Sequence, residues 1–285
     1  MPLEHLAIIG AGTMGHGIAY VAAAAGHAVA LTDAEPERVP GAMEQIRRAF
    51  EKGIARGKVT AAQRDAALAR IRAAGDLADA VNGATFIIEA IPENLPLKQA
   101  LFEELDQLAA DDAVLATNTS SLPVGQIARA TERPGSVVGT HFFNPVPAMK
   151  LVEVIRAEAT TDETVDRATE FARSLGKEPI VVRDMPGFAT SRLGIVLGLE
   201  AIRMVEQEVA SPADIDRAME LGYNHPVGPL RLGDLVGLDV RLAIADHLYQ
   251  TLGGDTYRAP ELLRRMVAEG RLGRKSGEGF YQWPT

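Results

Sequence analysis

Residues 6–15, which read LAIIGAGTMG, decide the fold of this chain. A short apolar run, typical of a buried strand, leads directly into Gly-x-Gly-x-x-Gly, and the small residues from 14 to 25 then predict a helix. Gly10 permits a sharp turn, Gly12 lets the backbone approach a pyrophosphate, and Gly15 lets the helix pack close to the strand. The pattern therefore predicts a strand, a tight turn and a helix whose N-terminal N–H groups face an anion.

A second apolar run distinguishes this unit from an ordinary glycine-rich turn. It covers residues 27–32 and ends at Asp33, about twenty residues beyond the glycines. An acid at this position accepts hydrogen bonds from the two ribose hydroxyls of NAD, and it repels the 2′-phosphate of NADP. We therefore expect a dinucleotide-binding unit that takes NAD.

The composition excludes several classes of function. The 285 residues carry a formal net charge of −9, so we expect no nucleic-acid partner. There is no apolar run of about eighteen residues, and the chain enters its first strand almost at once, so we expect no membrane partner and a cytoplasmic location. There is no cysteine, and the six histidines lack paired metal-ligand spacing, so we expect no metal site.

Strands and helices alternate over the first 185 residues, which predicts a Rossmann-type, doubly wound and mainly parallel sheet. Further strands are expected at 85–90, 113–117, 137–143, 151–155 and 179–183, and further helices at 35–56, 61–73, 97–108, 126–130 and 164–175. The alternation stops near Pro186. The expected organisation is an NAD-binding domain, residues 1–185, followed by an all-helical domain, residues 186–285.

The second domain is expected to contain helices at 193–208, 212–221, 232–252 and 261–269. The first of these is apolar on several sides, which exceeds what a lone surface helix needs. Burial against a second subunit explains the excess, and so does a deep core within the chain.

Polar residues follow the predicted strands in series. They comprise the Gly10 loop, Asp33, Glu93 with Asn94, the turn 118–121, and His141. A structural turn explains any one of them. Because ligands of such sheets bind at the carboxyl ends of the strands, the whole series predicts the rim of a binding cleft.

His141 and Glu153 are the candidate proton-transfer pair. Histidine has a pKa near neutrality, which suits a base that removes an alcohol proton while hydride leaves carbon. Glu153 interrupts the apolar strand 151–155, where an unpaired buried carboxylate costs several kcal/mol. Either this strand is an edge that faces water, or it returns beside strand 137–143 and brings Glu153 to His141.

A positive cluster of Lys52, Arg56 and Lys58 lies where the helix 35–56 ends. A solvated helix end explains it, and so does a binding site for the phosphorylated tail of a substrate. The sequence pattern alone leaves both interpretations open.

Several blocks of the sequence strongly resemble the short-chain L-3-hydroxyacyl-CoA dehydrogenases, including the bacterial 3-hydroxybutyryl-CoA dehydrogenases. They are GAGTMG at 10–15, NTSSL at 118–122, HFFNP at 141–145, MKLVEV at 149–154 and GRKSGEGFY at 273–281. The resemblance covers essentially the whole chain in order. It implies an NAD domain followed by a helical domain that forms a homodimer, an acyl-CoA substrate, and a setting such as fatty-acid metabolism.

The resemblance also implies roles for individual residues. His141 is the expected catalytic base, Glu153 the carboxylate that orients it, and Ser120 the hydroxyl that binds the substrate oxygen. Lys52 and Arg56 are expected to hold the CoA phosphates. The expected NAD contacts are Gly10, Gly12, Thr13, Met14, Gly15, Asp33, Glu93, Lys98, Asn144 and Lys275.

One position departs from the family pattern. The best-known members read Pro-Gly-Phe-x-x-Asn-Arg, whereas this chain has Ser191 in place of the asparagine. The resemblance places that residue near the substrate carbonyl. Ser191 keeps a hydroxyl donor but is shorter, so a water fills the gap or the acyl group binds differently.

These observations predict reversible oxidation of an L-3-hydroxyacyl-CoA to a 3-ketoacyl-CoA with NAD. Two alternatives share the glycine motif. One is an NAD-dependent dehydrogenase of a hydroxy acid without CoA, and the other is an NAD-binding protein without catalysis.

Overall fold

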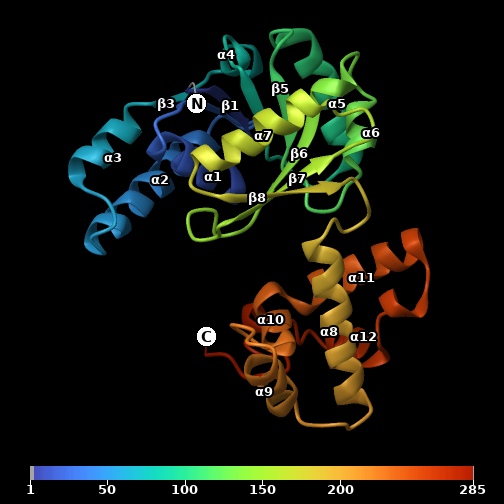
Figure 1. Cartoon of the computed structure of the whole chain (residues 1–285). Helices are drawn as coiled ribbons and strands as arrows, with labels where there is room; N and C mark the ends of the chain where they lie inside the picture. Colours follow the sequence, from blue (N-terminus) through green and yellow to red (C-terminus); the bar gives the residue numbers. More distant parts are fainter. Residues whose placement is uncertain (1–2, 285) are drawn as a thin grey trace. The chain divides into compact units, whose positions relative to one another are not determined.

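The computed structural model describes residues 3–284. These residues form two compact units, of which the first ends at Met185 and the second begins at Pro186 (Figure 1). The first unit contains the sheet and the second is helical. Within the described range, no helix has the length and apolar character needed to cross a membrane.

The sheet of the first unit has eight strands in the order β3-β2-β1-β4-β5-β6-β7-β8. They are β1 (His5–Ile9), β2 (Ala28–Thr32), β3 (Ile71–Ala73), β4 (Phe86–Glu89), β5 (Val114–Thr117), β6 (Val137–Phe142), β7 (Leu151–Arg156) and β8 (Glu178–Arg183). Strands β1 to β6 are parallel, β7 is antiparallel to β6, and β8 is parallel to β7. The predicted doubly wound, mainly parallel sheet is confirmed. The strand order reverses between β1 and β4, where such folds bind ligands.

The helices of the first unit connect these strands. They are α1 (Thr13–Ala24), α2 (Arg38–Ala55), α3 (Ala61–Leu68), α4 (Leu77–Val81), α5 (Leu95–Leu108), α6 (Val124–Ala128) and α7 (Asp162–Ser174). Side chains cap several of them as local sequence dictates: Thr60 forms a capping box with Gln63 at α3, and Asn94 accepts from the N–H of Leu97 at α5. Strand β4 packs on α7 through Phe86 and Phe171, whose ring centroids are 4.5 Å apart.

Two predicted helices differ in the structure. The helix expected at 61–73 ends at Leu68, and residues 71–73 instead form β3, because they pair with Val29 to Leu31 of β2. Helix α4 follows β3 and was absent from the expected elements. The helix expected at 232–252 is two helices, because Gly237 adopts a φ of +110° that a helix cannot include.

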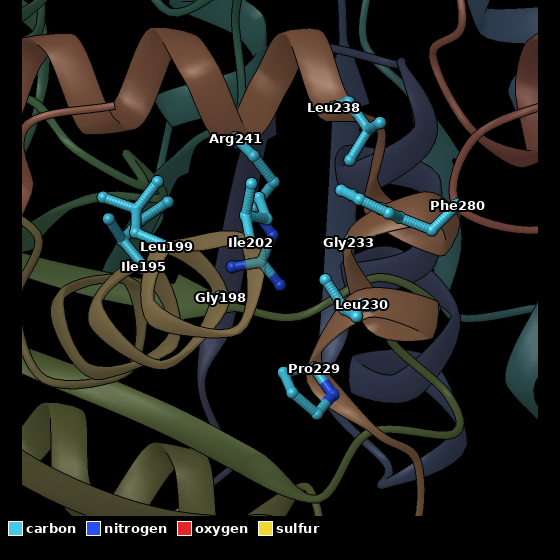
Figure 2. A pocket seen from close by; sticks show the side chains of 10 residues that line it. All are labelled: Ile195, Gly198, Leu199, Ile202, Pro229, Leu230, Gly233, Leu238, Arg241 and Phe280. Carbon is cyan, nitrogen blue, oxygen red and sulfur yellow. The ribbon is translucent and has the colours of Figure 1, made fainter. Parts of the chain in front are cut away.

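The second unit contains α8 (Thr190–Glu206), α9 (Pro212–Gly222), α10 (Pro229–Val236), α11 (Leu238–Leu252) and α12 (Glu261–Ala268). Helices α8, α10 and α11 pack against one another around buried Leu199, Leu230 and Leu238. Between them lies a cavity of about 10 Å³, and Arg241 extends into this space from α11 (Figure 2). A cavity of this size holds about one water molecule and is too small for a ligand.

Candidate active site

The carboxyl ends of β1, β2 and β4 border a cleft of about 610 Å³, a size typical of cofactor pockets. Five of the predicted site residues lie around the strand ends that form it. Gly10, Gly12, Thr13, Met14 and Asp33 all line this cleft. The cleft is also lined by the loop after β4, through Ala90, Ile91 and Pro92, and by α5, through Leu97, Ala100, Leu101 and Glu104.

The three motif glycines have different surroundings. Gly10 has a φ of +109°, and a Cβ there would lie 2.6 Å from the carbonyl oxygen of Ala90. A Cβ on Gly15 would lie 1.7 Å from the carbonyl oxygen of Gly10. A Cβ on Gly12, in contrast, would have no atom within 4 Å. Gly10 and Gly15 are therefore required by the fold, whereas Gly12 leaves open space in the cleft, which fits a bound pyrophosphate.

The same cleft offers hydrogen-bond donors to an anion. Helix α1 begins after Gly12 with no side-chain cap and no acidic residue in its first turn, so its free N–H groups remain available to a ligand. Asp33 accepts hydrogen bonds from the N–H groups of Ala11 at 2.7 Å and Glu35 at 3.0 Å, which fix its carboxylate beside the glycine turn.

His141 and Glu153 are adjacent in the structure. They are paired residues in the antiparallel β6–β7 ladder, and His141 Nδ1 lies 2.8 Å from Glu153 Oε2. Glu153 is 0% exposed and His141 7%, so the alternative of a water-facing edge at Glu153 is wrong. Because an ionised carboxylate only accepts hydrogen bonds, this contact favours the neutral tautomer with the proton on Nδ1, in which Nε2 has the lone pair that a base requires.

Ser120 is held by Glu93. Glu93 Oε1 accepts hydrogen bonds from Thr119 Oγ1 at 2.7 Å, Ser120 N at 2.9 Å and Ser121 N at 3.1 Å. The hydroxyl of Ser120 lies 3.2 Å from the same oxygen. Although burial acts to raise it, the hydrogen bonds of Thr119 and Ser120 and the charge of Lys98 together lower the pKa of Glu93.

Sequence reasoning missed Glu89, the last residue of β4. Its side chain is 0% exposed, and its carboxylate accepts from Lys98 Nζ at 2.5 Å and Thr117 Oγ1 at 2.6 Å. Burial raises the pKa of Glu89, while the charge of Lys98 opposes that shift. The signal that identified Glu153, an acid within an apolar strand, was also present at Glu89.

The other predicted site residues lie elsewhere. Asn144 is exposed in the turn between β6 and β7. Lys52 and Arg56 are exposed at the end of α2, and neither has an ion pair within the described residues. Ser191 and Lys275 belong to the second unit, where Ser191 lies in the first turn of α8 and Lys275 Nζ is 2.6 Å from Asp239 Oδ2. Across residues 3–284, no group of three or more His, Asp and Glu residues is arranged to hold a metal ion.

Comparison with known proteins covers both units. Residues 5–185 match the model of the 3-hydroxyacyl-CoA dehydrogenase NAD binding domain, and residues 187–283 match that of the C-terminal domain of the same enzymes. A probable 3-hydroxybutyryl-CoA dehydrogenase of Deinococcus radiodurans is 46% identical over 97% of this chain and 99% of its own. A similarly named protein of Bacillus subtilis is 42% identical, over 99% and 98%. Among solved structures, (S)-3-hydroxybutyryl-CoA dehydrogenase from Ralstonia eutropha is 38% identical, covers both chains fully and has a TM-score of 0.96.

Proposed function

The chain belongs to the 3-hydroxyacyl-CoA dehydrogenase family, and we propose that it catalyses NAD-dependent, reversible oxidation of an L-3-hydroxyacyl-CoA to the 3-ketoacyl-CoA. A short acyl chain, as in 3-hydroxybutyryl-CoA, is the proposed substrate, in keeping with the names of its relatives. The observation that carries the proposal is the buried His141–Glu153 pair, because it gives an imidazole a fixed tautomer.

In the proposed mechanism, His141 Nε2 accepts the proton of the C3 hydroxyl as hydride leaves C3. Glu153 stabilises the imidazolium that forms and keeps the proton on Nδ1. The hydroxyl of Ser120, which donates to Glu93 Oε1 at 3.2 Å, is proposed to turn and donate to the substrate oxygen. Bound NAD⁺ supplies the hydride acceptor.

The direct test mixes the purified chain with NADH and acetoacetyl-CoA and measures the loss of NADH absorbance. We expect turnover with NADH and much weaker turnover with NADPH, because Asp33 repels the 2′-phosphate. A ladder of acyl-CoA lengths then measures kcat/KM for each chain length. An inactive wild-type chain that still binds NADH would contradict the enzyme assignment and favour a binding protein.

Gly12→Ala is expected to weaken NADH binding without weakening the fold. The added methyl group meets no protein atom within 4 Å, and the φ of −69° at Gly12 suits alanine. It enters the space proposed for the pyrophosphate, so Kd should rise about 10- to 100-fold, which corresponds to an overpacking cost of about 1–3 kcal/mol. Fluorescence titration measures Kd and thermal melting measures stability.

Gly15→Ala is the matched comparison, since its methyl group would collide with the Gly10 carbonyl. We expect this variant to lose melting temperature, whereas Gly12→Ala should melt as the parent does. Unchanged NADH affinity in Gly12→Ala would show that the phosphates bind elsewhere.

The double variant Lys52→Ala/Arg56→Ala distinguishes a CoA ester from a free hydroxy acid. We propose that these two cations bind the CoA phosphates, so KM for acetoacetyl-CoA should rise about tenfold when both are removed. KM for free acetoacetate should not change. Arg47→Ala/Arg48→Ala, which removes two other exposed cations of α2, is the control.

Steady-state kinetics of both double variants with both substrates measures this difference. Equal KM values for acetoacetyl-CoA in the two double variants would show that Lys52 and Arg56 do not bind the CoA phosphates and only form a solvated helix end. Salt gives a further check: KM of the parent for acetoacetyl-CoA should rise with added salt, because salt screens an exposed phosphate contact.

We also propose that the chain forms a homodimer through its helical unit. Six large apolar side chains are exposed on the mutually packed α8, α10 and α11, namely Leu193, Leu197, Leu232, Leu235, Val236 and Val240. Such exposure is typical of a subunit interface. Light scattering should give twice the chain mass of 30.4 kDa, and Leu197→Glu should lower it. We propose fatty-acid metabolism as the metabolic setting of the chain. We propose the cytoplasm as its compartment, and fractionation of cells that express the chain tests this second proposal.

A further inference from the structure

We propose that Glu89 is a positioning residue for the dehydrogenase reaction. It fixes Lys98 inside the protein, and Lys98 holds Glu93 against the turn that carries Ser120. This inference deepens the proposed function and rests on it, because it concerns the placement of the proposed substrate contact.

Glu89 joins three segments of the first unit. Its Oε2 accepts from Thr117 Oγ1 at the end of the neighbouring strand β5. Its Oε1 accepts from Lys98 Nζ on α5 and from the N–H of Ile91 at 2.8 Å. A carboxylate that is 0% exposed stays ionised only with such partners, so its position and theirs depend on one another.

The partners of Lys98 are groups of the protein itself. Its side chain is 1% exposed, and its Nζ donates to the carbonyl oxygen of Ile91 at 3.3 Å as well as to Glu89. The same nitrogen lies 3.4 Å from Glu93 Oε2. In this arrangement Lys98 offers almost no surface to a nucleotide. We therefore assign it to the support of Glu93, in place of the direct cofactor contact that the family resemblance implies.

The network ends at the proposed substrate contact. Glu93 uses Oε2 toward Lys98 and Oε1 toward the residues of the turn 119–121. Glu89 and Lys98 also bind both the N–H and the carbonyl of Ile91, which lines the cleft. Loss of Glu89 would therefore displace the support of Ser120, while the glycine turn and Asp33 keep their own hydrogen bonds.

The test compares Glu89→Gln with Glu103→Gln. The two substitutions make the same chemical change, but Glu103 is exposed on α5 and lies outside the network. In Glu89→Gln, kcat for acetoacetyl-CoA should fall about 10- to 100-fold, because small displacements of a substrate contact have effects of this size. Kd for NADH should rise no more than about threefold, because the glycine turn and Asp33, which are proposed to hold its phosphates and adenine ribose, keep their own hydrogen bonds and only the expected contact at Glu93 is displaced.

A second substitution separates positioning from stability. Glu89→Gln removes the nearer counter-charge of the buried Lys98 ammonium and leaves only Glu93 at 3.4 Å, and the added change Lys98→Met removes that ammonium. The double variant should recover melting temperature and keep the low kcat. Thr117→Val keeps the side-chain shape but removes both the hydrogen bond to Glu89 and the acceptor of the Thr119 N–H at 3.3 Å, and it should lower kcat about three- to tenfold even if Glu89→Gln does not fold.

The inference is overturned if Glu89→Gln matches Glu103→Gln in kcat, if kcat recovers together with melting temperature in the double variant, or if Thr117→Val equals the parent. A proportional loss of NADH binding would also overturn it, because it would indicate general unfolding of the cleft. Failure of the proposed function is a distinct result, in which the unmodified chain does not turn over acetoacetyl-CoA.

Discussion

His141→Ala lowers kcat for the oxidation of 3-hydroxybutyryl-CoA by about 10²- to 10⁴-fold, the usual contribution of a general base. This is the result we expect because Nε2 of His141 is the proposed proton acceptor. The other ring nitrogen of His141, Nδ1, lies 2.8 Å from Glu153 Oε2. Steady-state NADH formation at saturating substrate measures kcat, and fluorescence titration of NADH shows that the cofactor still binds.

His5→Ala is the matched control for this loss. His5 is exposed at the first position of β1, at the end of that strand opposite the glycine turn. We expect this variant to keep the parent kcat. If His141→Ala oxidised the substrate as fast as His5→Ala, proton transfer would have to be assigned to another residue.

The pairing of β6 with β7 shows how much of the site can be predicted from sequence. Glu153 interrupts an apolar strand, so burial demands a partner, and the short connection after His141 allows an antiparallel return. Two local facts therefore predicted a contact between residues that face each other across the ladder. The doubly wound sheet could be predicted for the same reason, since each strand and helix has its own local pattern.

The errors arose where nonlocal pairing or a single backbone angle overrides the pattern. Residues 71–73 continue a helical pattern by composition, yet they form β3 because β2 offers an edge to pair with. Apolar spacing continues from α10 into α11, and only the positive φ of Gly237 separates them. Neither signal is visible in a short window of sequence.

Glu89 was missed for a different reason. It interrupts the expected apolar strand 85–90 as Glu153 interrupts its own, but the partner that its burial demands, Lys98, lies on the following helix. Only the structure shows that Lys98 extends back from this helix, so that its Nζ donates to Glu89 and to the carbonyl oxygen of Ile91. The family resemblance identified Lys98 and Glu93 but gave no reason for their proximity.

Glu153→Gln is the second change expected to have a very large effect. The substitution keeps the shape of the side chain but removes the charge that stabilises the imidazolium during proton transfer. The amide can also present its NH₂ group to Nδ1, which would favour the wrong tautomer and leave the proton on Nε2. Loss of the equivalent carboxylate in a serine-protease triad lowers kcat about 10⁴-fold, and we expect a fall of about 10²- to 10⁴-fold here.

The comparison that isolates this effect is Glu178→Gln. Glu178 begins β8, the strand beside β7, and its side chain is 75% exposed. Glu178→Gln should therefore leave kcat unchanged, whereas Glu153→Gln should lose most of it while NADH affinity and melting temperature stay near those of the parent. Because the His141–Glu153 contact is the observation on which the proposed function depends, a fully active Glu153→Gln variant would mean that the imidazole needs no orienting charge. His141→Ala would then decide whether the imidazole is still the base.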